Sequence, residues 1–226
     1  MTARRMLGAL LATALAATST ALVGTASPAA AASPTLIVPS SGDSWISTTS
    51  ALPKHGDNIY FYIDVATTDG TPAPSSGTVT VEQSVAGGAW TTIATSPYTG
   101  YSGSTPAVGN AVYRVTYSGD TGGQWLPTTA ELAVSVQRDV STVSISGKRA
   151  GVKGKLTPAA KTKITAFKKH GKKWKKFKTI RSTAKGRYTM ILPTPRRGKF
   201  QWKIVFAGDQ QFTASTLFGS TSRRLY

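Results

Sequence analysis

The chain has 226 residues, no cysteine and a formal net charge of +18 at pH 7. Without cysteine it cannot be a disulfide-stapled scaffold, so its stability must come from the burial of core residues. Its length is sufficient for two domains of roughly 100 residues each.

The first 32 residues predict a secretory signal peptide. Arg4-Arg5 form a basic start, residues 6–23 are rich in Ala and Leu, and Ala30-Ala31-Ala32 supplies the small residues of a cleavage site. Polar residues interrupt the apolar stretch, which argues against a membrane-spanning helix. We therefore expect residues 1–32 to be removed and the mature chain to begin at Ser33. The paired arginines also form part of a twin-arginine signal, so the sequence leaves the Sec and Tat export routes open.

Residues 33–137 show the period-two alternation of half-buried strands, and no helical spacing follows the signal peptide. Successive side chains of a strand leave opposite faces of the pleat, so alternate apolar residues share one buried face. Turn signals such as Gly87-Gly88 separate the apolar runs, as in an antiparallel β-sandwich. The residues expected to face the core are Ile59, Phe61, Ile63, Val65, Val79 and Val81.

Residues 138–226 repeat this pattern. The segment Val79–Trp90 corresponds to Ile164–Trp174, and Tyr113–Asp120 corresponds to Trp202–Asp209. A duplicated module with loops of variable length has these properties. The expected core face of the last of these segments is Phe200, Trp202, Ile204 and Phe206.

The second repeat resembles the Ig-like repeat domains of secreted actinobacterial proteins. The matching motifs are Gly154-Lys-Leu-Thr-Pro158, Lys172-Lys-Trp174, Lys185-Gly-Arg-Tyr188 and Phe206-Ala-Gly-Asp209. In the first repeat, residues 69–81 are similar to the Gly-x-Pro and Gly-Thr-Val segment of bacterial Ig-like repeats. The resemblance implies an Ig-like fold and a secreted, extracellular or cell-wall-associated location. Domains of this kind serve as spacers, adhesin segments or binding modules, so the resemblance is weak for function.

The predicted fold is all-β, with two tandem Ig-like antiparallel β-sandwiches after an N-terminal signal peptide. The predicted divisions are a signal peptide over 1–32, an acidic sandwich over 33–137 and a strongly basic sandwich over 138–226. The first sandwich has two bases and seven acids, a net charge of −5. The second has 23 bases and two acids, a net charge of +21, and such a surface attracts polyanions.

The most basic segment, Phe167–Lys178, is predicted to form two strands joined by a turn at His170-Gly171. Lysine predominates over arginine here, and lysine is a hydrated point charge that favours broad attraction over base-specific recognition. Trp174 and Phe177 match Trp90 and Ile93 and are predicted to be packing residues. The predicted polyanion contacts are Lys168, Lys169, Lys172, Lys173, Lys175, Lys176 and Lys178. Residues expected to extend this surface are Lys148, Arg149, Lys153, Lys155, Arg187, Arg196, Arg197 and Lys199.

An anionic cell-envelope polymer, such as a teichoic acid or a similar phosphate-rich glycopolymer, is the favoured partner. Extracellular nucleic acid and anionic lipid are less favoured and nonspecific. One alternative is a carbohydrate-binding module that stacks sugars on Tyr98, Tyr101 or Trp125. Another is head-to-tail self-association, in which the acidic domain of one molecule meets the basic domain of the next. A third interpretation assigns the lysines only to solubility or to protection of strand edges.

We predict no catalytic residues, no cofactor and no metal site, and hence no enzyme. Only His55 and His170 are present, and each lies beside a turn glycine rather than at metal-ligand spacing. Asp120 and Asp209 occupy equivalent Gly-Asp turns, where an aspartate can accept hydrogen bonds from nearby backbone amides. That local role accounts for their repetition without catalysis.

Overall fold

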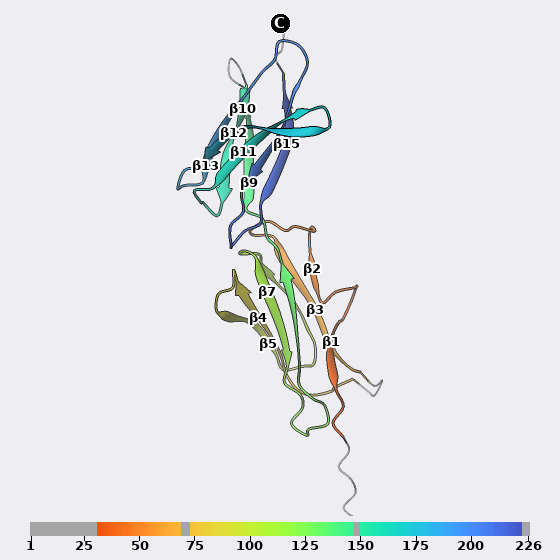
Figure 1. The fold of residues 1–226 in the computed structure, drawn as a ribbon. Helices are drawn as coiled ribbons and strands as arrows, with labels where there is room; N and C mark the ends of the chain where they lie inside the picture. Colours follow the sequence, from red (N-terminus) through yellow and green to blue (C-terminus); the bar gives the residue numbers. More distant parts are fainter. Residues whose placement is uncertain (1–30, 69–72, 147–149, 223–226) are drawn as a thin grey trace, which may run out of the picture. The chain divides into compact units, whose positions relative to one another are not determined.

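The computed structural model describes residues 31–68, 73–146 and 150–222. These residues form strands, turns and loops, and none of them is helical (Figure 1). The predicted all-β class is confirmed, and the paired sheets form tandem β-sandwiches. The signal peptide predicted for residues 1–32 falls almost wholly outside the described residues.

The strand bounds of the first repeat are β1 (Thr35–Pro39), β2 (Ile46–Thr48), β3 (Asn58–Thr67), β4 (Val79–Val85), β5 (Trp90–Ser96), β6 (Tyr101–Pro106), β7 (Ala111–Tyr117) and β8 (Thr128–Val134). In one sheet β3 pairs with β1, β2 and β6, and the other has the order β5-β4-β7-β8. All of these pairs are antiparallel. The core-facing residues predicted on β3 and β4 are at most 1% exposed, so their alternation is confirmed.

The strand bounds of the second repeat are β9 (Asp139–Ile145), β10 (Ala150–Thr157), β11 (Lys163–His170), β12 (Lys173–Arg181), β13 (Arg187–Leu192), β14 (Phe200–Phe206) and β15 (Ser215–Thr221). One sheet has the order β13-β10-β9 and the other β12-β11-β14-β15, again with antiparallel pairs. A second hydrophobic cluster lies between these sheets. Trp202, Ile204 and Phe206 are buried in it as predicted, whereas Phe200 is only half-buried at its edge.

The two repeats share an irregularity of their hairpins as well as a strand order. The register of β4 against β5 shifts between Val81 and Glu82, and that of β11 against β12 shifts between Ala166 and Phe167. These positions are equivalent in the duplicated pattern. A β-bulge retained at the same place supports duplication of one module.

Residues that follow β14 contribute to the core cluster of the first repeat. The ring of Phe212 is fully buried in that cluster, 6.0 Å from the ring of His55 between centroids. The guanidinium of Arg138 lies 4.2 Å from the Phe212 ring centroid and donates a 2.6 Å hydrogen bond to Asp209 Oδ2. Asp209 Oδ1 accepts hydrogen bonds from the amides of Gln211 and Phe212, which confirms its local turn role.

Burial alone would raise the pKa of the Asp209 carboxyl. The hydrogen bond from Arg138, the backbone donors and the positive charge of Arg138 together outweigh that effect and hold the pKa below its usual value. The side chain of Arg138 is 9% exposed, so its charge is compensated locally rather than offered to a ligand.

Hydrogen bonds fix the same segment to a loop of the first repeat. The amide of Asn110 donates to Gln211 O at 2.7 Å, and its side-chain Nδ2 donates to Gln210 O at 3.2 Å. Gln210 Nε2 in turn donates to Ala86 O, and Thr213 Oγ1 donates to Asn110 Oδ1. The sequence pattern did not predict this contact. The domain bounds at 137 and 138 stay a prediction.

Candidate polyanion-binding surface

The basic hairpin comprises β11, β12 and the two-residue turn between them (Figure 1). His170 pairs with Lys173, so Gly171 and Lys172 form the turn, and Gly171 has a φ of 59°, which favours glycine. All seven lysines predicted as polyanion contacts are exposed. The structure therefore places them together on one hairpin, in contact with solvent.

In the described part of the chain, no carboxylate forms an ion pair with these lysines. Among the residues that the structure describes, four ion pairs occur and none includes a lysine of the hairpin. The two acids of the second repeat are both used elsewhere, since Asp139 lies 4.0 Å from Lys54 Nζ and Asp209 binds Arg138. The positive charge of the hairpin is thus left for an external counterion or ligand.

The other basic residues expected to extend this surface divide into three groups. Arg196, Arg197 and Lys199 are exposed in the loop that precedes β14. The Phe177 and Phe200 rings, 5.4 Å apart, place the end of this loop beside the hairpin. In contrast, Lys153, Lys155 and Arg187 belong to the sheet of β10 and β13 and do not join the hairpin strands. Lys148 and Arg149 lie outside the described residues.

The predicted packing role of the hairpin aromatics is only partly correct. Trp174 is half-buried, and its ring centroid lies 5.9 Å from that of Phe218. Phe177 packs against Phe200 but is 41% exposed, and Phe218 is 67% exposed. The duplicated pattern did not predict a role for Phe218, which pairs with Lys203 of β14.

The aromatic residues proposed for the carbohydrate-binding alternative do not form a stacking surface together. Trp125 is 9% exposed and packs in the first core cluster, so its ring is not available to a sugar. Tyr101 packs partly against the same cluster and contacts Phe61, with ring centroids 6.2 Å apart. Only Tyr98, 74% exposed, stands in solvent.

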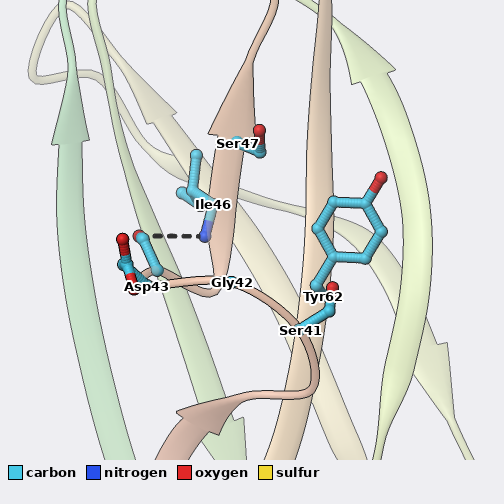
Figure 2. Close-up of a pocket in the computed structure, with 7 residues that line it drawn as sticks. Ser41, Gly42, Asp43, Ile46, Ser47 and Tyr62 are labelled. Carbon is cyan, nitrogen blue, oxygen red and sulfur yellow. Dashed lines mark hydrogen bonds between the residues drawn. The ribbon is translucent and has the colours of Figure 1, made fainter.

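A hollow in the first repeat offers little for catalysis. Its lining includes Asp43, Ile46 and Tyr62, and Asp43 and Tyr62 lie on opposite sides of β2 (Figure 2). The amide of Ile46 donates a 3.3 Å hydrogen bond to Ser44 Oγ, a local turn contact. General acid–base chemistry needs a proton donor or acceptor paired with an activated group, and this lining provides no such pair.

The part of the chain that the structure describes contains no group of three or more His, Cys, Asp or Glu residues able to hold a metal ion. No helix there is long and apolar enough to cross a membrane.

Comparisons with known proteins show likeness of fold alone. No protein-family model and no curated protein matches the chain. The structure is similar to a segment of two fibronectin type-III domains from chicken tenascin, at 13% sequence identity and a TM-score of 0.45, covering 77% of this chain and 95% of that one. A tetra-tandem repeat from the extending region of a large adhesion protein is similar at 13% identity and a TM-score of 0.32, covering 84% of this chain and 49% of that one. The FN1–FN3 domains of chicken CNTN1 are similar at 13% identity and a TM-score of 0.26, covering 78% of this chain and 65% of that one.

Proposed function

We propose that this is a non-catalytic exported protein whose basic second repeat binds an anionic polymer of the cell envelope. The observation that carries the proposal is the hairpin of seven exposed lysines, none of which pairs with a carboxylate of residues 31–68, 73–146 or 150–222. The favoured ligand is a teichoic acid or a similar phosphate-rich glycopolymer. Each phosphate that a lysine neutralises releases counterions, so the affinity must fall as salt increases.

The signal peptide predicted over 1–32 supports this location at the cell surface or in the medium. The domain bounds 33–137 and 138–226 belong to the same proposal, because they assign the acidic and basic charges to separate sandwiches. Two core clusters support that division, one built mainly from β3, β4 and β7 and the other from β10, β11, β13 and β14, although Phe212 of the second repeat joins the first cluster.

Replacing four hairpin lysines with glutamine is expected to weaken binding to wall polymer at least tenfold at low salt. The slope of log affinity against log salt should become shallower by roughly one per lost phosphate contact. The stability should change little, because exposed charges away from ion pairs contribute within about 0.5 kcal/mol each. The four residues are Lys168, Lys172, Lys173 and Lys175.

The matched control removes the same charge from four exposed lysines outside the hairpin: Lys153, Lys155, Lys161 and Lys185. Binding should fall much less in this control than in the hairpin variant. Equal losses in the two variants would show that net charge, rather than the hairpin, is responsible. Unchanged retention of the hairpin variant would contradict the proposal. Salt-dependent oligomers in light scattering would instead support head-to-tail self-association.

A further inference from the structure

In each β-sandwich, one position on the outer face carries a cation close to a tryptophan ring. In the first repeat, carboxylates neutralise this cation. Arg114 of β7 pairs across the sheet with Glu82 of β4 and Glu131 of β8. Its guanidinium lies 2.8 Å from a Glu131 oxygen and 3.9 Å from a Glu82 oxygen. It also lies 3.7 Å from the Trp90 ring centroid. Both the charge and the ring face are therefore occupied within the protein.

Lys203 of β14 holds the equivalent position in the second repeat, but its neighbours differ. Its cross-strand partners are Phe167 of β11 and Phe218 of β15, which replace the two glutamates. Lys203 Nζ lies 5.0 Å from the Phe167 ring centroid and 5.5 Å from that of Trp174. Among the described residues no carboxylate pairs with Lys203. The second repeat therefore has two phenylalanines where the first has two glutamates, and it keeps a cation at the position between them.

Two further cations lie on this face. Lys176 pairs with Phe167, and Lys169 pairs with Trp174. Directly opposed residues of an antiparallel pair project from the same face, so these ammonium groups flank the rings. Both lysines are exposed. We define the aromatic platform as Phe167, Trp174, Phe218 and Lys203, with Lys169 and Lys176 at its margin.

The geometry of the platform decides what kind of ligand it suits. Trp174 and Phe218 pack against each other with their planes 59° apart, so their rings do not form a parallel series. Phe218 is the most exposed of the platform rings at 67%. Single-stranded nucleic acids are bound by rings that stack successive bases, which needs several free ring faces. One free ring beside a cluster of cations instead fits one flat, partly apolar group that bears an anionic substituent.

We propose that the aromatic platform is a subsite for one acidic sugar unit of the bound polymer. The C–H face of a pyranose ring would pack on Phe218, and its carboxylate or phosphate substituent would lie near Lys203, Lys169 and Lys176. A sugar face is apolar enough to gain from contact with an aromatic ring, while lysine supplies a mobile point charge. This inference rests on the proposed function and narrows its ligand from any polyanion to a polymer with anionic sugar rings.

The test compares two polyanions, polygalacturonate and inorganic polyphosphate, because only the first contains sugar rings. Binding of the purified protein to each is measured by calorimetry at the same low salt concentration. Phe218→Ala should weaken binding to polygalacturonate about tenfold, the order of one lost stacking contact, and change binding to polyphosphate less than twofold. Phe218→Glu, which restores an acid of the first repeat, should weaken binding to polygalacturonate still further.

Phe177→Ala is the control, because Phe177 is an exposed ring of the same hairpin outside the platform. It should change neither affinity more than twofold. The subsite is wrong if Phe218→Ala leaves polygalacturonate binding unchanged or weakens both polymers equally. It is also wrong if oligothymidylate binds more tightly than polygalacturonate with the same dependence on Phe218. If polyphosphate binds in a salt-dependent way and Phe218→Ala has no effect on either polymer, the subsite is wrong but the proposed function is not. If neither polymer binds, the proposed function is wrong as well.

Discussion

Replacing Phe212 with alanine is expected to lower the free energy of unfolding by about 3–5 kcal/mol. The ring is fully buried in the core cluster of the first repeat, although the residue lies between β14 and β15 of the second. Its removal leaves a cavity and takes the stacking partner from Arg138, whose guanidinium lies 4.2 Å away. Urea denaturation at pH 7, followed by tryptophan fluorescence, measures the change.

Phe218→Ala is the matched control for this experiment, since it removes the same side chain from the same repeat. Phe218 is 67% exposed, so its loss should change the free energy of unfolding by no more than about 0.5 kcal/mol. Similar values for the two variants would show that Phe212 is not part of the first core cluster in solution.

Gly154→Ala is expected to destabilise the second repeat by about 3 kcal/mol or more, at the upper end of overpacking effects. Gly154 is in β10, the central strand of its sheet, opposite Thr142 and Tyr188. A Cβ atom at this position would overlap the Ser141 carbonyl oxygen and lie 2.8 Å from Tyr188 Oη. Backbone atoms cannot move aside as a flexible side chain can, so β9 would have to shift.

The Tyr188 hydroxyl lies close to the space that a Cβ atom at Gly154 would need. Tyr188 Oη lies 2.8 Å from Thr142 Oγ1 and donates to Ser141 O at 3.1 Å, so it joins β9 to β13 across the glycine. Lys153→Ala, at the exposed neighbouring position, should change the melting temperature very little. Equal melting temperatures for Gly154→Ala and Lys153→Ala would contradict the close approach of the two strands.

The strands were predictable because a strand that is buried on one face has apolar residues at every second position. Alternation placed Ile59, Phe61, Ile63 and Val65 on one face, and the structure buries all four. Phe200 has the same parity as Trp202 but is only half-buried, because it begins β14 at the edge of the cluster. Periodicity identifies a face of the sheet and does not report where that face ends.

The contact of Phe212 with the first core cluster was not predictable from local pattern. The Gly-Asp turn predicted the hydrogen bonds of Asp209, which are made within three residues. It did not predict that Phe212 would lie against a different repeat, because that depends on contacts far apart in the chain. The same limit applies to Arg138, which adds to the +21 count of the second repeat although its charge is compensated by Asp209.

The candidate site was predictable in its charge and not in its aromatic component. Burying a lysine without a charged partner costs free energy, and this segment contains no acid, so the exposure of its lysines could be predicted from its composition. The platform around Lys203 depends on which residues oppose it on β11 and β15, and a β-bulge beside Phe167 changes the register of the hairpin. Comparison of the two repeats at Arg114 and Lys203 could have found it, because the exchange of two glutamates for two phenylalanines is visible once the strands are paired.

The proposed function requires that the basic hairpin hold the protein to an anionic envelope polymer. The most direct test is binding of the purified protein to cell walls with and without their teichoic acids, across a salt series. If the hairpin binds the polymer electrostatically, binding will require the teichoic acid and will fall steeply as salt increases. Binding that is independent of salt, or equal on walls stripped of the polymer, would contradict it.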